Sequence, residues 1–181
     1  MNKKRAVFID RDGVVVRAIF RKGFEFPTAP FSFAELSFFE GIDESLVLLK
    51  EMGFLRILAT NQPDVGYGNI SKEEWNKIQN KVEEFSFDDV FICHHIREAV
   101  CACKKPKPGM LLAAAEKWNI DLKNSYIIGD TEKDMDAGLA AGCKRILIRT
   151  DYNQKIRESF EAVSFLSAVK LIQLIEKGGI K

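Results

Sequence analysis

The sequence predicts an α/β fold, a three-layer, Rossmann-like parallel sheet flanked by helices. Short apolar runs alternate with helical stretches along the chain, which is the pattern of a parallel sheet. The run 6–9 is apolar at every position, as expected for a central strand covered on both faces. The chain of 181 residues suits one compact core, so we expect residues 1–181 to form a single domain.

The individual elements follow from local patterns. Five strands are expected where apolar runs occur, at residues 6–9, 54–59, 90–93, 125–128 and 146–148. Five helices are expected between and after them, at residues 41–52, 71–85, 108–118, 132–141 and 164–176. Gly53 and Gly142 are typical C-terminal stops. Ser71 and Glu74 have the spacing of a capping box, and Pro108 suits the first turn of a helix.

Residues 15–39 fit neither the helical nor the strand periodicity. The segment contains Pro27 and Pro30 and is rich in aromatic residues, namely Phe20, Phe24, Phe26, Phe31 and Phe33. We expect an ordered excursion over one end of the sheet. Its aromatic side chains would either cradle a sugar ring or only cover the sheet.

The charge balance restricts the partners of the protein. Lys and Arg number 27 against 26 Asp and Glu, a formal charge of +1, which gives no general attraction to nucleic acid or to an anionic membrane. No apolar run approaches the roughly 20 residues of a membrane span. The first apolar run stops at Asp10, so this run is too short for the apolar core of a signal peptide. We therefore expect a cytoplasmic protein, monomeric, with no nucleic-acid or membrane partner.

Polar residues stand at the carboxyl ends of three predicted strands, where ligands bind in open parallel sheets. Asp10 and Asp12 follow the first strand, and Asp130 and Asp134 follow the fourth. Residues 60–62 (Thr-Asn-Gln) end the second strand. Because Asp10 and Asp12 are two apart, an extended backbone would lean their side chains the same way. Crowded carboxylates need a cation, and oxygen ligands favour Mg²⁺.

A second cluster lies in the segment 93–103, which we call the zinc loop. Cys93, His95, Cys101 and Cys103 form a set of three thiolates and one imidazole, which is a known tetrahedral zinc set. His94 is a competing ligand, but His95 repeats the one-residue gap of the cysteine pair. The alternative is a buried strand cysteine beside incidental thiols.

The polar motifs together resemble the haloacid dehalogenase superfamily. The matching motifs occur in the family's order: Asp10-x-Asp12-Gly13, then Thr60 after an apolar strand, then Lys105-Pro106 before a helix, then Gly129-Asp130-x-x-x-Asp134. They span residues 10–134 of the chain.

This resemblance implies a phosphatase mechanism. Asp10 would attack phosphorus to form an aspartyl-phosphate, and Asp12 would serve first as general acid and then as general base. Thr60, backbone amides near Asn61, and Lys105 would neutralise the phosphoryl oxygens. Mg²⁺ would be held by Asp10, by the backbone carbonyl of Asp12, and by Asp130. Asp134 would support these ligands without binding the ion directly.

The segment 101–110, Cys-x-Cys-Lys-Lys-Pro-Lys-Pro-Gly-Met, is similar to the D-glycero-D-manno-heptose 1,7-bisphosphate phosphatases and their histidinol-phosphatase relatives. The similarity implies a structural zinc, no large cap domain, and a small sugar bisphosphate as substrate on the route to lipopolysaccharide or another surface glycan. Asn61, Gln62 and Lys104 would bind that substrate. Three positions depart from the group: Val14 replaces Thr, Lys104 replaces Arg, and Gly66-Tyr67-Gly68 replaces a segment ending in Ala-Arg-Gly.

Three other functions compete with this prediction. A histidinol-phosphate phosphatase would use the same catalytic core with another leaving group. A nucleic-acid 3′-phosphatase would call for a basic surface, which the charge balance disfavours. A catalytically idle interaction protein is disfavoured because Asp10, Asp12, Lys105 and Asp130 are all intact.

Overall fold

The computed structural model describes residues 3–179. Its centre is a six-stranded parallel sheet in the order β3-β2-β1-β4-β5-β6. The strands are β1 (Arg5–Ile9), β2 (Phe54–Asn61), β3 (Asp89–Cys93), β4 (Tyr126–Gly129), β5 (Lys144–Ile148) and β6 (Glu161–Ala162). The helices are α1 (Ile42–Glu51), α2 (Lys72–Glu83), α3 (Gly109–Trp118), α4 (Glu132–Ala141) and α5 (Phe165–Glu176), with 3₁₀ turns η1 (Phe33–Glu35) and η2 (Leu122–Asn124).

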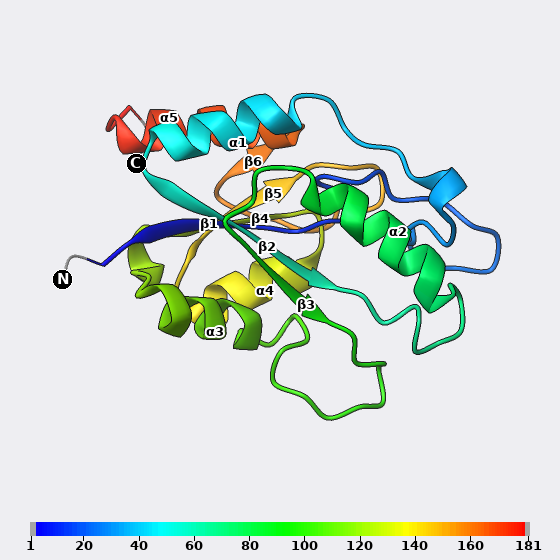
Figure 1. Cartoon of the computed structure of the whole chain (residues 1–181). Coiled ribbons are helices and arrows are strands. Elements are labelled where there is room, and N and C mark those ends of the chain that lie inside the picture. The colour runs from blue at the N-terminus through cyan, green and yellow to red at the C-terminus, as the bar shows by residue number, and fades with distance from the viewer. Residues whose placement is uncertain (1–2, 180–181) are drawn as a thin grey trace.

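The helices make two outer layers around the sheet. Helices α1 and α5 lie on one face and α3 and α4 on the other (Figure 1). One apolar core packs α1 and α5 on the sheet through Leu46, Leu49 and Val169, and the second packs α3 through Leu111 and Ala114. The predicted three-layer α/β class is confirmed, and no large cap domain interrupts the part of the chain described.

The predicted strands and helices agree with the structure within a few residues. Strand β6 was not predicted because it is only two residues long, Glu161–Ala162, and has no readable periodicity. Strand β2 extends to Asn61, two residues beyond the predicted end, so residues 60 and 61 still pair with β3. This extension places the polar side chains of the second strand at the carboxyl end of the sheet.

The capping box predicted for α2 is only half formed. The Ser71 hydroxyl accepts the Glu74 backbone N–H at 3.1 Å, as expected. The Glu74 carboxylate, however, accepts the backbone N–H of Phe33 at 2.7 Å and so ties α2 to η1. A complete capping box occurs instead at α4, between Thr131 and Asp134.

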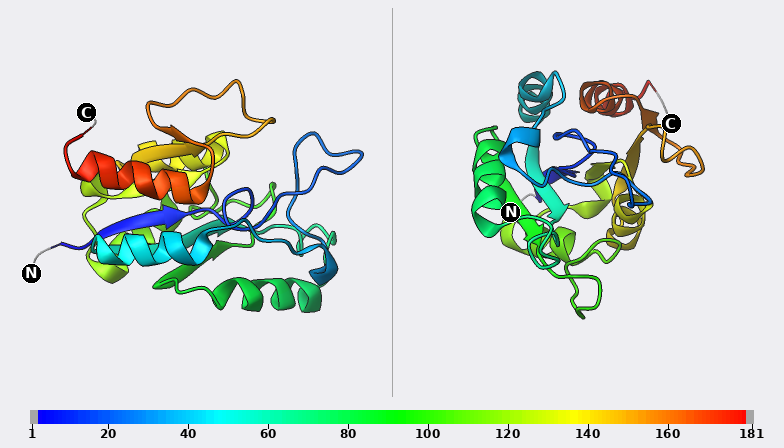
Figure 2. Two further views of the ribbon diagram at one scale, coloured as in Figure 1. Left: turned by 90° about the horizontal axis from the view of Figure 1, so that it is seen from above. Right: turned by 90° about the vertical axis from the view of Figure 1, so that its right-hand side faces the viewer.

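The 15–39 excursion is ordered and projects beyond the carboxyl ends of the strands (Figure 2). Ile19 pairs with Thr28 in an antiparallel bridge. Arg21 forms an ion pair with Glu35 and also lies 4.2 Å from the centre of the Phe31 ring. The prediction of an ordered excursion over one end of the sheet is confirmed.

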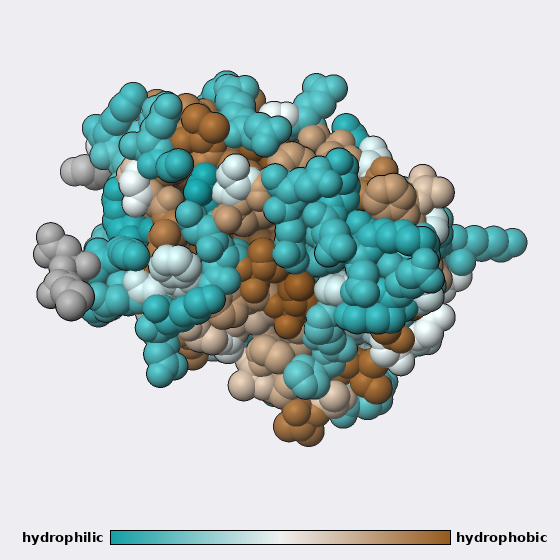
Figure 3. All heavy atoms as spheres, in the orientation of Figure 1, coloured by the Kyte–Doolittle hydropathy of each residue, from teal (hydrophilic) through white to brown (hydrophobic). Residues whose placement is uncertain are grey.

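The surface agrees with the balanced composition. The face in Figure 3 is mainly hydrophilic, with small hydrophobic groups between the polar residues. Within residues 3–179, no helix combines the length and the apolar character needed to cross a membrane.

Candidate active site

Three carboxylates meet at the carboxyl ends of β1 and β4. Asp10 follows β1, Asp130 follows β4, and Asp134 lies in the first turn of α4, with ligand oxygens within 4.8 Å of one another. Gly13 lets the Asp130 carboxylate lie close to the backbone after β1, because a Cβ at this position would lie 2.1 Å from Asp130 Oδ2. Its φ of +86° also favours glycine. The strand-end prediction therefore identified a real cluster, built by two loops that the parallel sheet brings together.

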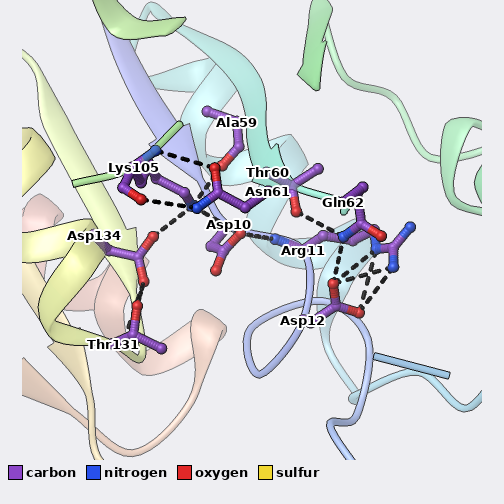
Figure 4. A network of polar contacts seen from close by, with 10 residues as sticks. All are labelled: Asp10, Arg11, Asp12, Ala59, Thr60, Asn61, Gln62, Lys105, Thr131 and Asp134. Carbon is purple, nitrogen blue, oxygen red and sulfur yellow. Dashed lines mark hydrogen bonds and ion pairs between the residues drawn. The ribbon is translucent and has the colours of Figure 1, made fainter. Parts of the chain in front are cut away.

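Lys105 bridges two of these carboxylates (Figure 4). Its Nζ lies 2.9 Å from Asp10 Oδ1, donates to Asp134 Oδ1, and donates to the Ala59 carbonyl at 2.8 Å. Burial opposes the charge of Lys105, but the carboxylates of Asp10 and Asp134 raise its pKa above the ordinary value. The ammonium thus stays charged in a buried position, with all three donors used.

The carboxylate cluster fits a divalent cation. Burial first, and then the Asp134 carboxylate, raise the pKa of Asp10 to about 6. Burial, followed by the Asp10 and Asp134 carboxylates, raises the pKa of Asp130 well above its usual range. Asp130 Oδ1 is buried and has no hydrogen-bond partner within the described residues. A cation between Asp10 and Asp130 would satisfy that oxygen and favour both carboxylates in the ionised form, and oxygen-only ligands suit Mg²⁺.

Asp12 takes a different direction from Asp10. The chain leaves the strand conformation after Ile9, so the alternation expected for an extended backbone does not apply. The Asp12 carboxylate accepts from Arg11 Nε and Nη2 at 3.1 Å and from Gln62 Nε2 at 2.6 Å. Figure 4 shows Asp12 turned away from Asp10 toward these two residues. The expected common lean of the two side chains is therefore wrong.

The segment 60–62 places its three side chains in three different environments. Thr60 is buried, and its hydroxyl oxygen accepts from Gln62 Nε2 at 3.0 Å. Asn61 clamps the backbone of Lys105, accepting its N–H and donating to its carbonyl, both at 3.0 Å. Gln62 is 1% exposed and donates its Nε2 to Asp12 Oδ2. Asn61 and Gln62 thus hold neighbouring site residues with their amides, and their direct contact with substrate, expected from the sequence, stays a prediction.

Lys104 stands beside this site with a free head group. It is half-buried, and within residues 3–179 its ammonium makes no hydrogen bond or ion pair. Its neighbours in the chain, Cys103 and Lys105, are fixed by the thiol cluster and by the carboxylates respectively. The structure therefore leaves the Lys104 charge available to a ligand.

The zinc-loop side chains converge as the sequence predicted. Cys93 Sγ lies 3.5 Å from His95 Nδ1, 3.9 Å from Cys101 Sγ and 3.3 Å from Cys103 Sγ. All four cysteines of the chain are free thiols. A tetrahedral zinc site, with Zn–S about 2.3 Å and Zn–N about 2.0–2.1 Å, separates its ligand atoms by roughly 3.5–3.8 Å. The geometry is compatible with a zinc ion.

Crowding in the zinc loop disfavours the ionised form of Cys103 when no metal is bound. Burial, and then the neighbouring Cys93 and Cys101 thiols, raise the pKa of Cys103 to about 12. A metal ion would reverse this by stabilising the thiolates. His94 lies outside the cluster, with its ring edge-on to Trp75 at a centroid distance of 4.7 Å. The structure thus gathers His95 with the thiols and leaves His94 out.

Sequence reasoning missed three residues of the site. Arg11 occupies the unspecified position of the Asp-x-Asp motif, and nothing in the motif assigns it a role. Tyr152 donates its hydroxyl to Asp130 Oδ2, and Asn153 Nδ2 donates to the Asp130 carbonyl at 2.8 Å. Both follow the end of β5, so the strand-end rule that identified Asp10 would also have pointed to this loop.

A parallel sheet whose carboxyl edge carries Asp10, Asp12, Asp130 and a buried Lys105 is the architecture of a haloacid dehalogenase-type phosphatase. Comparison with known proteins agrees. The HAD-hydrolase-like family model matches residues 102–164.

Two curated relatives and one solved structure are similar over most of the chain. The D-glycero-beta-D-manno-heptose-1,7-bisphosphate 7-phosphatase of Vibrio cholerae serotype O1 is 38% identical, over 89% of this chain and 89% of the relative. The enzyme of that name from Helicobacter pylori strain 26695 is 35% identical, over 82% and 85%. The crystal structure of D,D-heptose 1.7-bisphosphate phosphatase from B. bronchiseptica, complexed with magnesium and phosphate, has a TM-score of 0.79 at 26% identity and covers 96% of this chain and 99% of that chain.

The chain therefore belongs to the haloacid dehalogenase-like hydrolases, in the family of the D-glycero-D-manno-heptose-1,7-bisphosphate phosphatases. It is a phosphoric monoester hydrolase. The resemblance inferred from the motifs is confirmed.

Proposed function

We propose that this enzyme removes the 7-phosphate from D-glycero-β-D-manno-heptose 1,7-bisphosphate in a magnesium-dependent reaction. The observation that carries the proposal is the buried, unpartnered oxygen of Asp130 beside the Asp10–Lys105 ion pair. The names of the two curated relatives support the choice of sugar and phosphate. The cytoplasmic location and monomeric state expected from the sequence remain predictions.

In the first step, a carboxylate oxygen of Asp10 forms a bond to phosphorus while the bond from phosphorus to the sugar oxygen breaks. Asp12 transfers its proton to that leaving oxygen. Asn61 holds the backbone of Lys105, and Lys105 keeps Asp10 oriented through the 2.9 Å ion pair. The product of this step is the free sugar hydroxyl and an aspartyl-phosphate on Asp10.

In the second step, Asp12 is ionised and removes a proton from water. The resulting nucleophile attacks phosphorus, breaks the bond to Asp10 and releases inorganic phosphate. The Thr60 hydroxyl hydrogen has no acceptor among the described residues, so it is available to a phosphoryl oxygen. Asp12 regains its proton, and the enzyme returns to its starting state.

Asp10, Asp130 and the backbone carbonyl of Asp12 would hold Mg²⁺. Asp134 supports them from behind, because its two oxygens already accept from Lys105 and Thr131. When bound, the ion would offset the charge of the carboxylates and of the phosphoryl group. Cys93, His95, Cys101 and Cys103 would hold a structural zinc ion, whose loop leads directly into Lys104 and Lys105.

The second phosphate of the substrate would meet Lys104. A lysine is a point charge and cannot grip a phosphate bidentately as an arginine does. Lys104→Ala should therefore raise the KM for the bisphosphate and leave the KM for a monophosphate nearly unchanged. Lys123→Ala, on η2 at the other end of the sheet, is the matched control.

The decisive test is a comparison of phosphate release from three substrates in the presence of Mg²⁺. We expect the highest kcat/KM with the heptose bisphosphate, a lower value with histidinol phosphate and the lowest with a 3′-phosphorylated oligonucleotide. A higher kcat/KM with histidinol phosphate, together with equal effects of Lys104→Ala on mono- and bisphosphates, would contradict the heptose assignment. Absence of turnover with every phosphate ester would contradict catalysis itself.

A further inference from the structure

Gln62 joins the proposed acid–base residue to helix α2. Its Nε2 donates to Asp12 Oδ2 at 2.6 Å and to the Thr60 hydroxyl at 3.0 Å. Its Oε1 accepts the indole N–H of Trp75 at 3.3 Å. Gln62 is 1% exposed and Trp75 is 6% exposed, so water contributes little to either bond. Both ends of the Gln62 amide are thus engaged by protein groups.

The Trp75 bond decides which end of the Gln62 amide faces Asp12. An indole nitrogen is a donor only, so it must meet the carbonyl oxygen of the amide. The NH₂ group then points to Asp12, where it donates to the carboxylate. Without the indole donor, the amide can turn over and present its carbonyl oxygen to the Asp12 carboxylate. Two acceptors would then face each other in a buried place, which is unfavourable.

Trp75 is itself held against the zinc loop. It packs with Ile70 and Ile78 in a small apolar cluster. The ring of His94 meets it edge-on, with centroids 4.7 Å apart and an interplanar angle of 74°. His94 lies between Cys93 and His95, two members of the thiol–imidazole cluster. The position of Trp75 therefore depends on how the zinc loop is folded.

We propose that Trp75 is a positioning residue for Asp12, acting through Gln62, and that His94 links the zinc loop to it. The inference rests on the proposed acid–base role of Asp12. The zinc loop then supports catalysis along two routes. One runs through Cys103 and Lys104 to Lys105, and the other runs through His94, Trp75 and Gln62 to Asp12.

The leaving group of the substrate separates positioning of Asp12 from a general structural effect. A sugar alkoxide is a poor leaving group and needs the proton of the general acid, whereas p-nitrophenolate leaves without one. The parameter kcat/KM reports the steps up to departure of the leaving group. A badly placed Asp12 should therefore lower kcat/KM for the sugar phosphate much more than for p-nitrophenyl phosphate.

The test compares Trp75→Phe with Trp118→Phe. Both changes remove an indole N–H and keep an aromatic ring, and the Trp118 indole donates to Asp89, away from the site. With Trp75→Phe we expect kcat/KM for the heptose bisphosphate to fall about tenfold, the range of one lost hydrogen bond, and less than about twofold for p-nitrophenyl phosphate. Trp118→Phe should leave both values unchanged, and both variants should keep their zinc content.

Two further variants test the remaining links. Gln62→Glu should reproduce the leaving-group dependence, because a second carboxylate would face Asp12. His94→Ala should give a smaller effect of the same kind, whereas His94→Phe, which keeps an aromatic edge on Trp75, should restore wild-type values. Equal losses for both esters in Trp75→Phe, or no loss, would overturn the inference while the phosphatase assignment stands. A wild-type enzyme that cleaves neither ester would remove the proposed function and the inference together.

Discussion

At the scale of single residues, the site depends on a few side chains with several simultaneous partners. Lys105 contacts Asp10, Asp134 and the Ala59 carbonyl, so no single partner determines its position. Asp130 accepts from Tyr152 through one oxygen and leaves the other unpartnered. The Tyr152 hydroxyl thus orients the carboxylate and leaves one oxygen available. Metal ligands in proteins are commonly oriented by such hydrogen bonds from neighbouring groups.

The first prediction concerns the nucleophile. Asp10→Asn should retain the fold and lose essentially all turnover, because an amide cannot form the acyl-phosphate. Asp136→Asn makes the same chemical change on the exposed side of α4 and should keep full activity. Steady-state phosphate release and thermal melting of both variants measure this. Near-normal turnover of Asp10→Asn would rule out the covalent mechanism.

The second prediction concerns the orientation of Asp130. Tyr152→Phe should raise the Mg²⁺ concentration for half-maximal activity about tenfold, because loss of an outer-shell partner typically weakens metal binding 10–100-fold. Tyr126→Phe is the control, since its hydroxyl bonds Glu176 and touches no site residue. Titration of activity with Mg²⁺ gives both values. An unchanged requirement in Tyr152→Phe would mean that the hydroxyl does not orient Asp130.

At the scale of elements, the loops carry the site residues and the sheet aligns these loops. The loops after β1, β2, β4 and β5 all leave the same edge, so residues distant in the sequence meet there. The zinc loop leaves the edge after β3 and returns at α3, and the Gln62 backbone N–H donates to the Cys93 carbonyl at 2.7 Å. A disturbance in the zinc loop therefore reaches the neighbouring strand end.

The third prediction concerns the zinc loop. Cys101→Ser should abolish tight zinc binding and disorder the segment that carries Lys104 and Lys105, because closed thiolate sites contribute folding energy directly. Cys143→Ser is the matched control, since that thiol is buried outside the cluster. Metal analysis and amide hydrogen exchange of residues 101–107 report the two effects. Wild-type protein prepared without chelators and found free of zinc would refute the prediction.

At the scale of the whole molecule, the sequence predicted the architecture because a central parallel sheet has a strong apolar signature. It also predicted Asp10 and Asp130, since strand ends converge by topology. It could not predict that the Glu74 carboxylate would contact Phe33, because that partner lies 41 positions away. Arg11 was missed for a related reason. Its guanidinium is 1% exposed, and a buried arginine is identified by its partners, which periodicity does not reveal.

The fourth prediction separates the two metals. Gel filtration into Mg²⁺-free buffer should abolish activity, and adding Mg²⁺ should restore it fully, while one zinc ion per chain remains bound throughout. The reason is that Mg²⁺ would bind through few protein ligands and keep several waters, whereas a closed tetrahedral zinc site exchanges slowly. Phosphate release and metal analysis on the same fractions measure this. Loss of zinc together with activity would contradict the separation.

The carboxylate cluster around Lys105 also sets an order of binding. The carboxylates of Asp10, Asp130 and Asp134 outnumber the single ammonium of Lys105, so the cleft disfavours a phosphate until a divalent cation has entered. Metal and phosphate should then bind with positive cooperativity, and by thermodynamic reciprocity each must strengthen the other by the same factor. Calorimetry with inorganic phosphate would detect this as a tighter Mg²⁺ dissociation constant in its presence. Inorganic phosphate, the product of the reaction, would accordingly bind the enzyme more tightly when the metal is bound, and the metal would bind more tightly when phosphate is bound.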